Sequence, residues 1–431
     1  MLMALAWPLL VNADANADDL LSVYAQARAA DPLLAKAHAQ RGSQVEAAAQ
    51  ARAALLPQWT LGADKSQANP DSANTNSLSS HISQSLLDVA LWRSLAAENT
   101  LLSAQDARLA AAQQALCARV ANAYFGVLLA QAGLHTSRAN EAAFAEQVKQ
   151  AQSRFEAGLS AQLDVDQART YHQLVRGNLF QAEQTLADAS QALAEITGSQ
   201  PGPLSPLALD LPALPPQPQD VQAWVARALS RNPQLKAIDL DLSASERRIE
   251  AARAGHLPTL SLGLDSERRS GSAVAEGLSG RNLNTVGLKL NIPLFAGGAT
   301  QSQVRQAGYR RDAAQSDQES ARRALIRATQ AQYQAVLATL AQMDSSRLAV
   351  TAADQALAST KAGQGLGLRT MTDLLLAIQT QASAQNAHEQ ARHRYVLAKL
   401  LLSQAAGSLD ETELAAINLW LQTADTARKS S

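Results

Sequence analysis

Two periodicities of apolar residues divide this chain into strands and helices. In four stretches apolar and polar residues alternate, which is the period of a strand with one apolar face. The clearest alternation has apolar residues at Val286, Leu288, Leu290 and Ile292. The pattern predicts strands at about 58–66, 77–87, 259–267 and 283–293, paired as two hairpins.

Between the hairpins the apolar residues follow a helical period. A stretch without proline runs from Val89 to Phe155, about 100 Å of helix at 1.5 Å per residue. Its apolar residues recur at spacings of 3 and 4, as at Leu116, Val120, Ala123 and Val127, which is typical of a coiled-coil seam. A second long helix is predicted at 299–363, and shorter helices at 161–197 and 370–406 end at Gly198 and Gly407.

The chain contains an internal duplication. The turn Gly158-Leu-Ser-Ala-Gln-Leu-Asp164 recurs 209 residues later as Gly367-Leu-Arg-Thr-Met-Thr-Asp373. Near the start of each half the offset is 201, because Pro32 matches Pro233. We therefore expect about eight extra residues in the second hairpin loop, between Asp265 and Asn284.

The duplication gives a domain organisation. We expect a first repeat at 18–198 and a second at 221–407, joined by a proline-rich linker at 199–220 and followed by a C-terminal segment at 408–431. Residues 1–17 resemble a signal peptide, with an apolar run followed by Ala15-Asn16-Ala17, but no lysine or arginine precedes that run. We interpret them as a signal peptide truncated at its start. No stretch of about twenty apolar residues predicts a transmembrane helix.

Composition excludes several classes of protein. Of 431 residues, 47% are hydrophobic and only 4% aromatic, which suits closely packed long helices. A net charge of -1 argues against a nucleic-acid partner. The single cysteine, Cys117, permits no internal disulfide, and His388 and His393 do not share a helix face as a metal pair would. No nucleophile–base set is visible, so we expect neither an enzyme nor a cofactor.

The four strands leave the fold incomplete. Four strands cannot close a barrel, and open edges beside an apolar face pair with other chains. If that face meets lipid, several copies must contribute strands to one barrel. Alternatives are a soluble helical bundle with added hairpins, and a periplasmic coiled-coil adaptor or scaffold, although an adaptor needs no lipid-facing strands.

The mature chain resembles the TolC-like outer-membrane efflux proteins. The residues that carry the resemblance are Ala54-Leu-Leu-Pro-Gln58, Gly255-His-Leu-Pro-Thr259, Val286-Gly-Leu-Lys-Leu-Asn-Ile-Pro-Leu294, Gly297-Gly298 and the turn 367–373. The resemblance implies a mainly α fold with a small β part, built as a homotrimer. Twelve shared strands would form a barrel in outer-membrane lipid, continued by a trimeric α-barrel tunnel of coiled-coil helices through the periplasm. An equatorial belt would include 201–220 and about 410–424.

The resemblance also implies partners and a gate. Such channels dock with a periplasmic adaptor and an inner-membrane transporter of the ABC or RND type, in efflux or type I secretion. The periplasmic end closes near the turns at Gly158 and Gly367, where Asp373 would form the pore constriction. The latch groups would be Arg369, Asp164 and Gln364.

The chain departs from the family's gate pattern at three positions. A second ring aspartate is replaced by Leu376, a latch tyrosine by Gln364 and a latch threonine by Leu163. We expect these changes to weaken the closed state. Thr370 and Asp373 also have the spacing of a capping box, so the aspartate has a structural interpretation as well.

Overall fold

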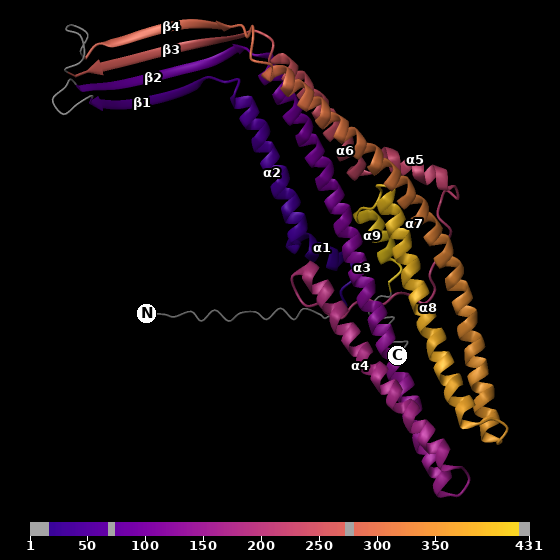
Figure 1. Ribbon diagram of the computed structural model, residues 1–431. Helices are drawn as coiled ribbons and strands as arrows, with labels where there is room; N and C mark the ends of the chain where they lie inside the picture. Colours follow the sequence, from indigo (N-terminus) through magenta and orange to yellow (C-terminus); the bar gives the residue numbers. More distant parts are fainter. Residues whose placement is uncertain (1–16, 68–73, 272–279, 422–431) are drawn as a thin grey trace, which may run out of the picture. The chain divides into compact units, whose positions relative to one another are not determined.

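The computed structural model describes residues 17–67, 74–271 and 280–421. The predicted signal peptide at 1–17 lies outside these residues except for Ala17, and so does the tail beyond residue 421. The helices are α1 (Leu20–Ala30), α2 (Pro32–Ala53), α3 (Val89–Glu156), α4 (Gln162–Thr197), α5 (Val221–Arg231), α6 (Pro233–Ala254), α7 (Ala299–Gly365), α8 (Met371–Ala405) and α9 (Glu411–Asn418) (Figure 1).

Prolines interrupt the helices at the start of each half. Helix α1 ends before Asp31-Pro32, and α5 ends before Asn232-Pro233. Asp31 and Asn232 both have extended backbone, at ψ 119°, as a residue before proline prefers. Each half therefore enters its hairpin through two helices in succession.

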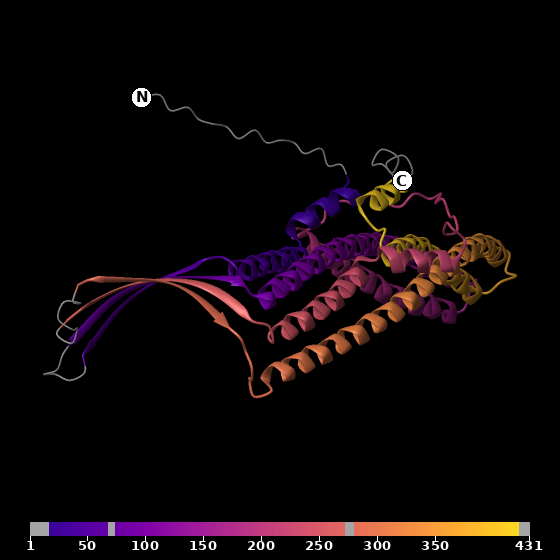
Figure 2. The same cartoon turned by 90° about the horizontal axis from the view of Figure 1, so that it is seen from above.

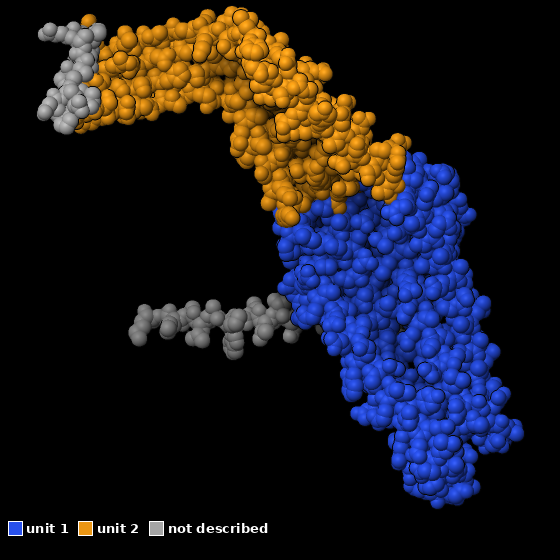
Figure 3. Space-filling model, in the orientation of Figure 1, with its two compact units in different colours: residues 1–35, 112–232, 325–431 blue, residues 36–111, 233–324 orange. Residues whose placement is uncertain are grey.

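The chain forms two compact units, shown in blue and orange in Figure 3. The first contains residues 1–35, 112–232 and 325–431, and the second contains 36–111 and 233–324. Each unit takes segments from both halves of the sequence, because elements from the two halves pack against each other within it. The duplication therefore does not divide the chain into two separate bodies.

The second unit contains one antiparallel sheet in the order β1-β2-β3-β4. Its strands are β1 (Gln58–Gln67), β2 (Asn74–Leu87), β3 (Thr259–Ser270) and β4 (Asn282–Asn291). The two hairpins join because β2 pairs with β3, and the strands twist along their length (Figure 2). The last paired residues are Gln67 and Asn74 in the first hairpin but Arg268 and Asn282 in the second. The second hairpin therefore has the longer connection, as the change of offset predicted.

The first unit has an apolar core beside the two turns. The core consists of Phe144 and Ala151 from α3, Val165, Ala168 and Val175 from α4, and Met371, Leu374, Leu375 and Ile378 from α8. Small and branched side chains at 3-and-4 spacing allow these helices to pack closely. The core fixes α4 and α8 of the two halves against each other next to the turns.

Helix α3 has one property that the sequence analysis did not anticipate. It is long and apolar enough to cross a membrane by length and composition, with an 18-residue window of mean hydropathy 1.3. Of that window, 56% is buried inside the protein, as in the core helix of a bundle. Burial accounts for the apolar stretch.

Candidate functional site

The sheet has one apolar and one polar face. Directly paired residues share a face, and one such row across the four strands is Trp59, Ile82, Leu264 and Val286. The next row is polar and consists of Thr60, His81, Asp265 and Thr285. In that row His81 Nδ1 lies 2.5 Å from Asp265 Oδ1. The predicted alternation is therefore present in the sheet.

The apolar face is uncovered in the single chain. Trp59 is 73% exposed and Val286 is 72% exposed. The outermost strands, β1 and β4, have no further strand beside them among the described residues. An exposed apolar face between two open edges requires both a covering and partner strands.

Both turns end their long helices with the same motif. Gly367 has φ 75°, its N–H donates to Gln364 O, and Leu368 N–H donates to Gly363 O. Gly158 has φ 72° and makes the equivalent bonds to Phe155 O and Arg154 O. This is the Schellman motif, in which a left-handed residue satisfies the last carbonyls of a helix. Glycine is favoured at both turns because a side chain is strained at positive φ.

The helices that follow the turns begin differently. Helix α8 begins with a complete capping box: Thr370 N–H donates to Asp373 Oδ2 at 3.0 Å, and Asp373 N–H donates to Thr370 Oγ1 at 3.1 Å. Helix α4 begins after Ala161, which offers no side-chain cap. The hydroxyl of the neighbouring Ser160 is buried without a hydrogen-bond partner in the described part of the chain. The two copies of the turn therefore share their backbone but not their caps.

The cap acts on the predicted pore aspartate. The hydrogen bond from the Thr370 backbone N–H, followed by that from its hydroxyl, holds the pKa of Asp373 below its ordinary value. Arg369 lowers this pKa further, by a smaller amount. The capping interpretation from the sequence is confirmed.

The predicted latch groups do not meet within one chain. Among the described residues, Arg369 forms no ion pair with Asp164, and no hydrogen bond joins either to Gln364. The stem of Arg369 lies against Gly363 instead, since a Cβ there would lie 2.9 Å from Arg369 Cγ. Asp164 sits in the first turn of α4, the position that corresponds to Asp373 in α8.

One contact does join the two helices beside the turns. Thr372 Oγ1 of α8 donates to Gln167 Oε1 of α4 at 2.8 Å. It lies at the rim of the apolar core that holds α4 against α8. The spacing of residues in the sequence did not predict this contact, because a threonine or a glutamine near the start of a helix is usually solvated.

Sequence reasoning also missed the polar groups that fix the linker. Arg392 of α8 is 4% exposed and donates to the carbonyls of Leu207 and Ala208. Tyr395 of α8 binds the backbone of Leu214 through its hydroxyl, accepting from the N–H at 3.0 Å and donating to the carbonyl at 2.9 Å. An arginine and a tyrosine in a helical stretch carry no signal that their partners are backbone groups of a distant segment.

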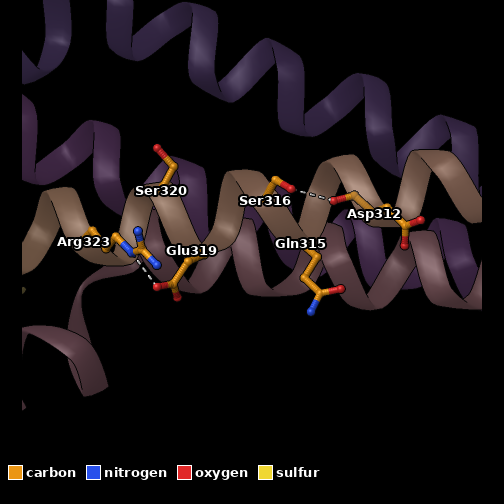
Figure 4. A pocket seen from close by; sticks show the side chains of 6 residues that line it. All are labelled: Asp312, Gln315, Ser316, Glu319, Ser320 and Arg323. Atoms are coloured by element: carbon orange, nitrogen blue, oxygen red, sulfur yellow. Dashed lines mark hydrogen bonds and ion pairs between the residues drawn. The ribbon is translucent and has the colours of Figure 1, made fainter.

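Other polar clusters offer little for binding. No group of three or more metal-binding side chains occurs in the described residues. His393 is buried, its Nδ1 lies 2.8 Å from Glu389 O, and burial lowers its pKa. A hollow of about 600 Å³ is lined by residues of α7 alone, namely Asp312, Gln315, Ser316, Glu319, Ser320 and Arg323 (Figure 4). With lining side chains from only one helix, this hollow holds a ligand poorly.

Comparison with known proteins identifies the family. The model of the family described as "Outer membrane efflux protein" matches residues 23–199 and again 224–408. The chain belongs to this family. The double match agrees with the duplication, and the resemblance found in the sequence is confirmed.

Individual relatives support the assignment. Outer membrane protein TolC of Escherichia coli is 33% identical over 419 residues, covering 94% of this chain and 85% of the relative. The proteases secretion protein PrtF of Dickeya chrysanthemi is 28% identical over 98% of this chain and 95% of its own length. The solved structure of CusC matches with a TM-score of 0.81 at 19% identity, covering 91% of this chain and 92% of that one.

The function and location follow from the family. The chain is an exit duct in the outer membrane of a Gram-negative bacterium, of the kind that serves efflux and type I secretion, with a long helical periplasmic part. Its family consists of channels rather than enzymes. The uncovered apolar face of the sheet is the face expected for membrane strands.

Proposed function

We propose that three copies of this chain form one channel, in which the twelve strands close a barrel and the helices form a tunnel. The observation that carries this proposal is the sheet with one exposed apolar face and two open edges. Strands of about ten residues have the length that a tilted membrane strand requires. Outer-membrane fractions should yield an oligomer band that heating converts to monomer, and recovery as a soluble monomer would contradict the trimer.

In this proposal the channel works with a periplasmic adaptor and an inner-membrane transporter of the ABC or RND type. The names of the relatives support such a system, because TolC and PrtF are called an outer membrane protein and a secretion protein. The tunnel closes at the turns, with Asp373 at the constriction and Arg369, Asp164 and Gln364 as latch groups between neighbouring helices. Lack of contact among these groups within one chain is compatible with a latch made between chains.

Replacement of Asp373 should reduce the cation preference of the channel. Three carboxylates near one axis attract cations, so Asp373→Ala should shift the reversal potential in a salt gradient toward zero. Asp373→Asn is the matched control for the cap, because its amide oxygen still accepts from Thr370 N–H. Both variants should lose the preference if the charge is the cause, and an unchanged reversal potential in Asn would contradict the ring.

The dependence of this preference on pH reports how the three carboxylates interact. Within one chain, hydrogen bonds from Thr370 hold the pKa of Asp373 below its ordinary value of 3.8. Three carboxylates that converge on one axis repel one another, which raises their pKa values and opposes the effect of the cap. The cation preference, measured as the reversal potential at falling pH, should therefore decline in acid as the ring takes up protons.

Removal of the Arg369 latch should make the closed channel leak. Arg369→Ser gives the second turn the residue that the first has at Ser160. An exposed ion pair is worth about 0.2–1 kcal/mol, so each lost latch should raise the open fraction about 1.4- to 5-fold. Basal conductance in planar bilayers measures the change, and Lys361→Ser, which removes an exposed cation from α7, is the control. Equal conductance of the Arg369 variant and wild type would contradict the latch.

A further inference from the structure

The contact between α4 and α8 has a counterpart that the single chain leaves unmade. Within the chain, Gln167 of the first repeat accepts a hydrogen bond from Thr372 of the second. At the offset of 209 residues, Gln167 corresponds to Leu376 and Thr372 corresponds to Leu163. These two equivalent positions therefore hold polar residues, Gln167 and Thr372, where the first repeat meets the second within a chain. They hold leucines, Leu376 and Leu163, where the second repeat would meet the first repeat of another copy.

A closed ring of copies makes both pairings. Inside each copy the first repeat is followed by the second, and between copies the second repeat is followed by the first repeat of the next chain. If neighbouring repeats meet in similar ways, the position equivalent to Gln167 in one repeat lies near the position equivalent to Thr372 in the next repeat. Between copies these positions hold Leu376 and Leu163, so the same geometry brings two leucines together.

The exposures of the two leucines agree with an uncovered contact. Leu163 is 63% exposed and Leu376 is 58% exposed, although both lie one turn or less from the buried core residues Val165 and Leu375. Both side chains are therefore accessible to a neighbouring copy. In each of the two contacts the partners suit each other, since threonine and glutamine form a hydrogen bond and two leucines exclude water.

We propose that Leu376 of one copy packs on Leu163 of the neighbouring copy, as the apolar equivalent of the Thr372–Gln167 hydrogen bond within the chain. The inference rests on the proposed trimer and adds a specific contact beside its gate. It assigns a role to two of the positions at which the gate departs from the family pattern. The apolar contact would hold neighbouring copies together where the latch threonine and the second ring aspartate of the family pattern are missing.

Cross-linking can test the two contacts in one assay. Both test proteins carry Cys117→Ala, so that the buried native thiol does not contribute. One adds Leu163→Cys with Leu376→Cys and the other adds Gln167→Cys with Thr372→Cys. A short bismaleimide is applied to the assembled channel in membranes, and the products are separated on a denaturing gel after heating.

The two variants should give opposite results. The 163/376 variant should yield bands of two and three linked chains, because its cysteines meet between copies. The 167/372 variant should lose its free thiols, measured by mass, while it stays at the monomer position. Failure of the 163/376 variant to form linked chains, with the 167/372 variant linked internally, would overturn the inference.

An unheated sample distinguishes a wrong contact between residues 163 and 376 from a wrong proposal of the trimer. If the oligomer band is present without cross-linking between 163 and 376, the trimer stands and the contact is wrong. If no oligomer band forms in the wild type, the proposed trimer itself fails. Single-cysteine variants at 163 and 376 are the controls for chance collisions, and equally strong linked bands from either would also overturn the contact.

Discussion

Val286→Lys is expected to abolish insertion of the channel into the outer membrane. Val286 lies in the middle of β4, is 72% exposed and belongs to the apolar row with Trp59, Ile82 and Leu264. A lysine on the lipid face of a barrel costs about 2–4 kcal/mol near the bilayer midplane, and a trimer would carry three. The heat-sensitive oligomer band in outer-membrane fractions should disappear.

Thr285→Lys is the matched control for this prediction. Thr285 is the preceding residue of the same strand, in the polar row with His81 and Asp265, and Lys289 already occupies that face. The control adds the same charge to the same strand and should insert like the wild type. Insertion of both variants at wild-type levels would show that the apolar face does not meet lipid.

Replacement of Asp31, which lies between α1 and α2, is expected to destabilise the fold strongly. Its side chain is 1% exposed, accepts from Arg119 at 2.8 and 2.9 Å, and accepts from Leu34 N–H at 2.6 Å. Removing one partner of a buried ion pair lowers the free energy of unfolding by about 3–5 kcal/mol. Because Arg119 is one-third exposed, we expect a loss near the lower end of this range. Asp31→Ala should therefore lower the thermal unfolding midpoint, measured by helical circular dichroism in detergent.

The repeat supplies a control for Asp31. The equivalent residue is Asn232, whose amide donates to Ala405 O, and the position equivalent to Arg119 is Ala328. Asn232→Ala removes a neutral side chain at the same kind of helix break, so it should destabilise less. Equal shifts in both variants would contradict a special contribution from the ion pair.

The pH dependence of the Asp31 effect has a definite sign. The hydrogen bond from Arg119 is the largest cause of its lowered pKa, and burial opposes it. A carboxyl whose pKa is lower in the folded chain stabilises the fold above its unfolded pKa and loses that contribution as the pH falls. The difference between Asp31→Ala and wild type should therefore be full at neutral pH and shrink in acid.

Elements with strong periodicity could be predicted from the sequence. Alternation at Val286, Leu288 and Leu290 identified β4 and its apolar face, because a strand places every second side chain on one side. The spacing of Thr370 and Asp373 identified the capping box, because a cap is local. In both cases the deciding contacts are backbone pairs or lie within one helical turn.

Contacts between distant segments could not be predicted in the same way. Arg392 reaches carbonyls 184 and 185 residues away, and Gln167 meets Thr372 across 205 residues. Nothing in a single sequence separates such buried polar groups from solvated ones, since both occupy helical positions of similar composition.

The two open edges of the sheet affect how a defective copy acts on normal copies in the same cell, as well as how copies assemble. One edge is β1 and the other is β4, so in the proposed ring the copies join head to tail and each copy pairs twice. A copy that is damaged at β1 alone still offers an intact β4 and can occupy a place in a growing ring. In a cell that makes both forms, such a copy would disable its normal neighbours, so the defect would be dominant. A copy that never folds would leave the normal chains to assemble among themselves and would be recessive.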